Sequence, residues 1–180
     1  MPIREILLLG DPRLTQVSRP VAVDEREQIA GLVTDLFDTM RRFREVHGWG
    51  RAIAAPQIGV PLRVACMTLD RPYTLINPIL SEPSDERVEM WEDCMSFPEL
   101  LVRISNPRSC RLTYRDPDWR ERRAALEGDH AELVQHEVDH LDGVLAVARA
   151  IDGESFALRR AMPPRDLTLR GAFHELPDRE

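Results

Sequence analysis

Residues 135–143 decide how the rest of the chain is interpreted, and they read Gln135-His136-Glu137-Val138-Asp139-His140-Leu141-Asp142-Gly143. Two histidines four residues apart on a helix lie on the same face, one turn from each other. His136 and His140 can therefore bind one metal ion, and Glu137 projects beside them, where it can act on a water molecule. The alternative is a polar helix face that carries the HExxH spelling by chance.

The residues around this motif predict a packed helix over about 129–142, with Gly143 suited to its C-terminal end. Its packing face would be formed by the apolar residues Ala131, Leu133, Val134, Val138 and Leu141. Buried histidines and a buried glutamate need polar partners, which favours a metal site over a solvated face. Asp139 is either an exposed helix residue or a group that orients one of the imidazoles.

Two histidines leave a metal ion under-coordinated, so a third ligand is expected. The chain has three cysteines, Cys66, Cys94 and Cys110. So small and odd a number does not indicate a disulfide framework. Cys94 lies among polar and small residues, whereas the other two lie in apolar strand-like runs. A thiolate at Cys94 would complete a Cys–His–His set with an open position for water. Free cysteines are often buried without a chemical role, so spacing alone leaves the third ligand open.

The remaining sequence predicts one helix, a series of strands, and then the HExxH helix. Helical spacing of apolar residues predicts a helix over about 25–46, capped by Asp24 and ended by Gly48. Strand-like runs follow over 63–69, 73–76, 87–91, 100–104, 109–114 and 122–126. This order predicts an α+β fold.

The C-terminal part of the chain carries weaker signals. A short helix is expected near 154–160, and Pro163-Pro164 is expected to end regular structure. We therefore expect a single catalytic domain over residues 1–165 and a polar C-terminal tail over residues 166–180.

The composition argues against several classes of protein. Hydrophobic residues make up 43% and charged residues 31% of the 180 residues, as in folded globular domains. The net charge of −7 argues against non-specific nucleic-acid binding, which requires a basic surface. The apolar run from Ile6 to Leu9 is too short for a signal peptide, and no stretch approaches the length that spans a bilayer. We therefore expect a cytoplasmic protein that binds neither membrane nor nucleic acid.

Three separated motifs resemble those of the peptide deformylase family. The family pattern GxGxAAPQ corresponds to Gly50-Arg51-Ala52-Ile53-Ala54-Ala55-Pro56-Gln57. The pattern EGCLS corresponds to Glu92-Asp93-Cys94-Met95-Ser96, and QHExDHLxG is matched throughout by residues 135–143. Residues 6–14 also look like the family's N-terminal arm, so the likeness covers roughly residues 4–150. Three motifs in the family's order are far more specific than HExxH alone.

This resemblance implies a fold and a metal site. The fold would have partly open antiparallel sheets packed around a central HExxH helix. Cys94, His136 and His140 would bind one divalent metal ion. In this family the ion is typically Fe²⁺, and Ni²⁺, Co²⁺ or Zn²⁺ can replace it.

The resemblance also implies roles in catalysis and substrate binding. Glu137 would act as general base and then as acid. The side-chain amide of Gln57 and the backbone N–H of Met95 would donate hydrogen bonds to the formyl oxygen. The substrate groove would be shaped by Gly50, Ala52, Ile53, Glu132 and Leu133.

Two motif glycines are replaced in this chain. Ala52 stands at one of them, where a methyl group is added and a positive φ becomes costly. Asp93 stands at the other and adds a carboxylate beside Cys94, either solvated or near the substrate entrance.

Two acidic residues distinguish the start of the HExxH helix. Asp129 and Glu132 share a helix face with His136, where better-known family members are apolar and line the pocket for the methionine side chain. Alternatively, the two acids form a helix-start signal with Asp129 as the cap. If Glu132 faces the pocket, discrimination for formylmethionine should be weaker than in a typical deformylase.

The resulting hypothesis is a hydrolase that removes the N-formyl group from the formylmethionine of newly made polypeptides and releases formate. One alternative is a deformylase-like amidohydrolase acting on another formyl or acyl amide. A second is a catalytically silent relative that binds a peptide end or a metal. The expected partners are the N-formyl peptide and nascent chains, and nothing in the sequence supports contact with the ribosome.

Overall fold

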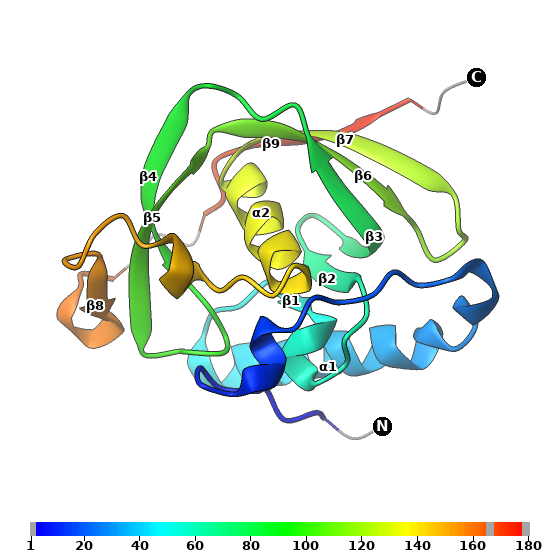
Figure 1. Ribbon diagram of the computed structural model, residues 1–180, viewed down its shortest axis with the longest axis horizontal. Helices are drawn as coiled ribbons and strands as arrows, with labels where there is room; N and C mark the ends of the chain where they lie inside the picture. Colours follow the sequence, from blue (N-terminus) through cyan, green and yellow to red (C-terminus); the bar gives the residue numbers. More distant parts are fainter. Residues whose placement is uncertain (1–2, 165–167, 178–180) are drawn as a thin grey trace.

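The computed structural model describes residues 3–164 and 168–177, and it contains two antiparallel sheets around one helix (Figure 1). The larger sheet has the strand order β1-β2-β3-β6-β7-β9, with β1 Ala52–Ala54, β2 Val64–Thr68, β3 Pro72–Ser81, β6 Ser109–Arg115, β7 Glu121–Gly128 and β9 Gly171–Leu176. The smaller sheet has the order β4-β5-β8, with β4 Arg87–Asp93, β5 Leu100–Pro107 and β8 Phe156–Leu158. The helices are α1 Ile29–His47 and α2 Asp129–Leu141. The α+β expectation is confirmed.

The HExxH helix α2 is the centre of the molecule. It lies between the two sheets, with β4 and β5 on one side and the larger sheet behind it (Figure 1). Its apolar face packs into a core with Met67, Leu75, Leu112 and Leu126 of the larger sheet. This packing keeps the motif helix rigid, which places its polar side chains at fixed positions toward the smaller sheet.

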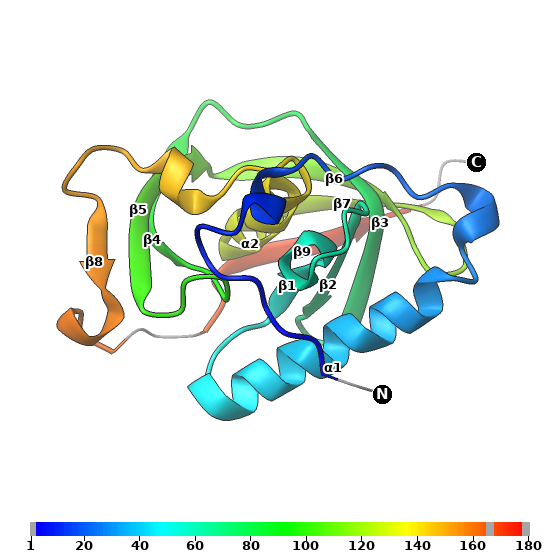
Figure 2. The ribbon, with the colours of Figure 1, turned by 60° about the horizontal axis from the view of Figure 1, so that its bottom comes forward.

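The other long helix, α1, covers the opposite face of β1 and β2 (Figure 2). Side chains alternate across a strand. Ala52 and Ala54 therefore belong to the core on the α2 side, whereas Ile53 packs with Leu36 and Met40 of α1. The strand β1 is thus sandwiched between the two helices.

The six strands expected from sequence are present, but the first helix begins later than expected. Its N-cap is Gln28, and Asp24 lies in a separate 3-10 turn, Val23–Glu25. This turn is stabilised by Glu25, whose carboxylate pairs with Arg19 at 2.7 Å and accepts the Ala22 N–H at 2.9 Å. The end of the helix agrees with the sequence, because Gly48 adopts a left-handed conformation with φ 77°.

The C-terminal expectations were partly wrong. Instead of a helix near 154–160, β8 pairs with the edge of β5, with Leu158 opposite Leu100, and a 3-10 turn follows over Arg159–Ala161. Regular structure also resumes after Pro163-Pro164, because β9 pairs with β7 along residues 123–128. Pairing with distant strand edges decides both outcomes. The division into a domain over 1–165 and a tail over 166–180 stays a prediction.

Among the residues that the structure describes, no helix has the length and apolar character needed to span a membrane.

Candidate metal centre and active site

The structure brings three expected metal ligands together. α2 presents His136 and His140, and Cys94 follows directly after β4. One ligand atom from each lies within 4.8 Å of the others, and all three side chains are buried. The Cys94 Sγ atom lies 3.2 Å from Nε2 of His140. The two remaining thiols lie elsewhere: Cys66 packs with the α1 core, and Cys110 packs within the larger sheet.

Glu92 orients one of the two histidines, a role that the sequence analysis did not assign. Its carboxylate lies 3.0 Å from Nδ1 of His136, and the two side chains are 3% and 8% exposed. A donor bond from Nδ1 leaves Nε2 of the ring as the atom that can bind a metal. The signal that could have found Glu92 is its place in the second motif, two residues before Cys94.

The electrostatics of the two histidines differ. Burial lowers the pKa of His136, but the charges of Glu92 and Cys94 outweigh it and hold the pKa well above its ordinary value. Burial, followed by the charge of His136, lowers the pKa of His140 well below its ordinary value. The surroundings of His140 thus favour the neutral ring that a metal ligand needs, whereas those of His136 favour the protonated ring, so metal binding at His136 would release a proton.

Glu137 lies beside the ligands in a buried position, with 3% of its surface exposed. Burial, reinforced by Glu92 and opposed by His136, raises its pKa to about 7. Its Oε2 atom has no hydrogen-bond partner among the described residues. A carboxyl group with a pKa near neutrality can both accept and return a proton.

Gln57 is fixed in a 3-10 turn, Ala55–Ile58, that directly follows β1. Its Oε1 atom accepts the backbone N–H of Ala54 at 2.8 Å. Its Nε2 atom lies 3.5 Å from Cys94 Sγ and 3.3 Å from Ser96 Oγ. The carbonyl end of the amide is therefore anchored, and the donor end points toward the ligand set.

Gly50 and Met95 form a close contact at the edge of the site. Gly50 has a φ of 105°, and a Cβ added there would lie 2.7 Å from the terminal methyl of Met95. The backbone conformation therefore favours glycine, and a Cβ at this position would also displace the flexible end of the Met95 side chain. Ala52, by contrast, sits in β1 opposite Met67 with a negative φ, so its methyl group is accommodated without backbone strain.

A single cavity contains most of the expected site residues. It is lined by Gly50, Ala52, Gln57, Cys94, Met95, Glu132, Leu133, His136 and Glu137. Ile53 is not among its lining residues, because it faces α1. Asp139 pairs with Arg149 at 2.6 Å, and no hydrogen bond of the described residues joins it to an imidazole.

The cavity also includes residues that the sequence analysis did not place there or left undecided. Asp129 lines it and is not the helix cap, which is Gly128; its carboxylate instead accepts the backbone N–H of Arg170 at 2.8 Å. Arg51 lines it as well. Asp93 lines it and forms an ion pair with Arg159 at 3.0 Å, so it lies at the substrate side of the loop.

Known proteins resemble the chain over most of its length. The profile described as polypeptide deformylase matches residues 3–155. Peptide deformylase 2 of Ralstonia nicotianae is 39% identical over 175 residues, covering 90% of this chain and 95% of the relative. Peptide deformylase of Hyphomonas neptunium is 38% identical over 153 residues, covering 82% of this chain and 84% of the relative.

Solved structures agree with the sequence relatives. The peptide deformylase of Thermotoga maritima has a TM-score of 0.78 at 31% identity and covers 84% of this chain and 100% of that one. A peptide deformylase from Synechococcus elongatus in complex with actinonin also has a TM-score of 0.78, at 28% identity, with 85% and 81% covered. The chain belongs to the polypeptide deformylase family, and it is a hydrolase that removes the N-formyl group from newly made polypeptides.

Proposed function

We propose that Cys94, His136 and His140 hold one divalent metal ion at the reacting formyl group, and that Fe²⁺ is the native ion. The donor set fits such an ion: a thiol and two imidazoles converge within 4.8 Å, with Nδ1 of His136 engaged by Glu92. The thiolate and imidazole ligands suit Fe²⁺, Ni²⁺, Co²⁺ and Zn²⁺ alike, and Fe²⁺ is favoured by the family resemblance. The bound ion supplies a Lewis acid and lowers the pKa of water toward neutrality.

Glu137 is proposed to move the proton. Its carboxylate takes a proton from the attacking water and then returns it to the amine nitrogen as the C–N bond of the formamide breaks. The pKa of about 7, which burial produces, suits both steps. Formate and a free amino terminus are the products.

Gln57 and the backbone N–H of Met95 are proposed to stabilise the oxyanion. Negative charge develops on the formyl oxygen as water attacks, and two preorganised neutral donors can accept that charge without moving. The support for Gln57 is the anchoring of its Oε1 atom by Ala54, which directs Nε2 to the site. Met95 is supported by its place next to Cys94 on the cavity wall.

The observation that carries the proposal is the burial of Glu137 next to a converging Cys–His–His set in the same cavity as Gln57. Its test is formate release from formyl-Met-Ala-Ser by protein loaded anaerobically with Fe²⁺. Glu137→Gln should retain the metal but lose a factor of about 10²–10⁴ in turnover. Normal turnover by Glu137→Gln would refute the mechanism. Absence of formate from wild-type protein would support a silent relative instead.

The identity of the native metal has its own test. Activity of the Fe²⁺ form should decay in air, because ferrous iron and a thiolate ligand both oxidise, whereas the Ni²⁺ form should persist longer. Metal analysis of protein purified anaerobically should find iron at one atom per chain. The proposed partners are formylated nascent chains in the cytoplasm, and the net charge of −7 offers no support for a ribosome contact.

A further inference from the structure

The segment that joins β4 to β5 carries two groups of the proposed site. This ligand loop, residues 93–99, contains the metal ligand Cys94 and the proposed oxyanion donor, the backbone N–H of Met95. The N-terminal arm holds the middle of the loop, because the Leu9 N–H donates to the Ser96 carbonyl at 2.8 Å. That contact leaves the two ends of the loop to be fixed by other residues.

Arg159 joins both ends of the ligand loop. It begins the 3-10 turn that follows β8, at the edge of the smaller sheet (Figure 1). At the far end of the loop, its backbone N–H donates to the Glu99 carbonyl at 2.8 Å, and its Nε atom donates to the Pro98 carbonyl at 2.9 Å. At the near end, its Nη2 atom pairs with the Asp93 carboxylate at 3.0 Å. One residue thus connects the start of the loop to its finish.

The same guanidinium covers a second part of the cavity wall, the ring of Trp49. The guanidinium carbon of Arg159 lies 4.0 Å from the centroid of this ring, as in a cation–π contact. The ring also packs edge-on against Phe43 of α1, with the two centroids 4.8 Å apart. Trp49 lines the same cavity as Asp93. Arg159 therefore ties the ligand loop to the segment that leads into β1.

The ion pair between Arg159 and Asp93 also has an electrostatic consequence. Asp93 places a carboxylate in the cavity where, in the proposed reaction, negative charge develops on the formyl oxygen. Two like charges in one cavity repel each other. Each side chain of the pair is 24% exposed, so water screens the pair only in part. Arg159 therefore offsets a charge that would otherwise oppose the reaction.

Both members of this pair are particular to the chain. Asp93 stands where the family motif has glycine, which offers no carboxylate to an arginine. Arg159 lies beyond residues 3–155, the part that the family profile matches. The C-terminal turn thus compensates for a substitution inside the motif.

We propose that Arg159 is a positioning residue for deformylation. It holds the ligand loop and Trp49 in place and neutralises Asp93, so that Cys94 and the Met95 N–H keep the geometry that the reaction needs. This inference rests on the proposed roles of Cys94 and Met95 and adds a residue that acts through them. Because the oxyanion forms only in the transition state, loss of Arg159 should reduce kcat more than it changes KM.

The first test measures kcat and KM of the metal-loaded full chain on formyl-Met-Ala-Ser. Arg159→Ala should lower kcat by about 10–100-fold, as expected for a small displacement of reacting groups. Arg159→Lys keeps the charge near Asp93 and should recover part of the loss. Arg160→Ala is the matched control, because Arg160 is the next residue of the same turn and is exposed. It should behave like wild type.

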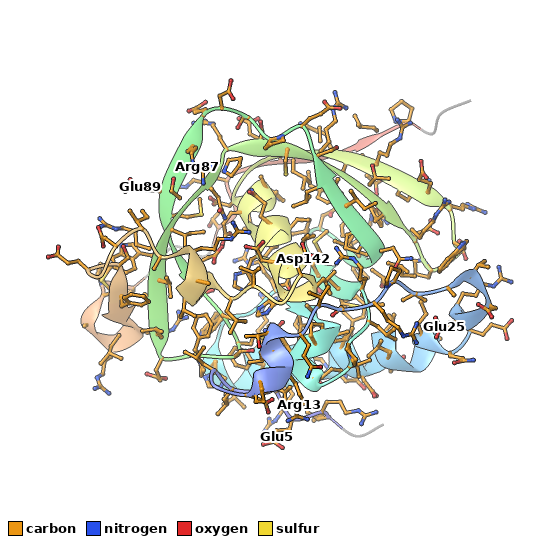
Figure 3. All side chains as sticks on the ribbon, in the orientation of Figure 1. Glu5, Arg13, Glu25, Arg87, Glu89 and Asp142 are labelled. Carbon is orange, nitrogen blue, oxygen red and sulfur yellow. The ribbon has the colours of Figure 1, made fainter. Side chains whose placement is uncertain are left out.

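A double-mutant cycle tests the pairing with Asp93. In an Asp93→Asn background, Arg159→Ala should cost at least about threefold less in kcat than in wild type, because no charge is left to neutralise. Glu89→Gln is the control background, since Glu89 is an exposed carboxylate on the same strand, β4 (Figure 3). There the cost of Arg159→Ala should be unchanged. An equal cost in the Asp93→Asn background would overturn the role assigned to the pair.

Hydrogen exchange of the metal-free protein tests the loop without activity. The Phe97 N–H, which donates to the Cys94 carbonyl at 3.1 Å, reports on loop opening. Loop amides should exchange faster in Arg159→Ala than in wild type or Arg160→Ala, while exchange in α2 stays the same. Faster exchange throughout the chain would mean a merely structural role and overturn the inference. If Arg159→Ala does not fold, Arg159→Lys is measured in its place, and wild-type kcat and exchange in it would overturn the inference.

The two levels of the argument fail differently. An active wild type whose kcat is unaffected by Arg159→Ala would overturn this inference alone. A metal-loaded wild type that releases no formate from formyl-Met-Ala-Ser would overturn the proposed function, and this inference with it.

Discussion

The carboxylate of Glu92 lies 3.0 Å from Nδ1 of His136, and both side chains are almost fully buried. The contact joins the end of β4 to the middle of α2, two elements from different parts of the chain. It fixes both the tautomer and the direction of the imidazole, which are the properties that a second layer of residues imposes on a metal ligand.

Glu92→Ala is expected to weaken metal binding by about 10–100-fold, because His136 loses the partner that orients it. Competition with a chelator of known affinity measures the change. Asp139→Ala is the matched control, since Asp139 is an acid on the same helix that pairs with Arg149. An equal loss in both variants would show that the effect of Glu92 is not specific to its bond with His136.

Cys94→Ala is expected to lose nearly all bound metal, because two imidazoles alone leave the ion under-coordinated. Cys110→Ala removes a second buried thiol that lies in the larger sheet, and it should keep one metal per chain. Elemental analysis of both purified variants measures the number of metal atoms per chain. Full metal content in Cys94→Ala would remove Cys94 from the ligand set.

Gln57→Ala is expected to lower kcat by about 10²–10³-fold, as for the loss of one oxyanion donor. The metal content should not change, so activity and metal analysis are measured on the same sample. The exposed Gln16→Ala serves as control for a glutamine outside the site. A loss confined to KM would mean that Gln57 binds substrate without stabilising the transition state.

Glu137 is expected to make the metal-free protein less stable as the pH rises. Its pKa is raised from 4.5 to about 7, mainly by burial, so the folded state favours the protonated form. Stability is therefore greatest below the unfolded pKa and is lost as the pH rises through about 7, by up to about 3 kcal/mol. In urea unfolding, the metal-free Glu137→Gln variant should have a larger free energy of unfolding than the wild type at about pH 8 and the same value near pH 4.

The control for this measurement is Glu154→Gln, which changes an exposed carboxylate outside the cavity. It should unfold like wild type at both pH values. A Glu137→Gln variant that is no more stable than wild type at high pH would show that the Glu137 carboxylate is solvated in the metal-free state.

Strand and helix signals were accurate where the local pattern was strong. The helix α2 and its end at Gly143 followed from apolar spacing and a terminal glycine, and the six predicted strands followed from their composition. The signals failed at residues 156–158 and 171–176, two short segments that form strands by pairing with the edges of β5 and β7.

The sequence by itself determined the features that depend on neighbours along the chain. His136, Glu137 and His140 share one stretch of helix, so their spacing alone predicts that they act together. Only the tertiary structure decided which thiol joins them, that Glu92 orients His136, and that Ile53 faces α1 instead of the cavity. It also brought Arg51, Asp129 and Glu132 to one wall. Such contacts join residues far apart in the chain, and their geometry depends on how sheets and helices pack, which no local pattern encodes.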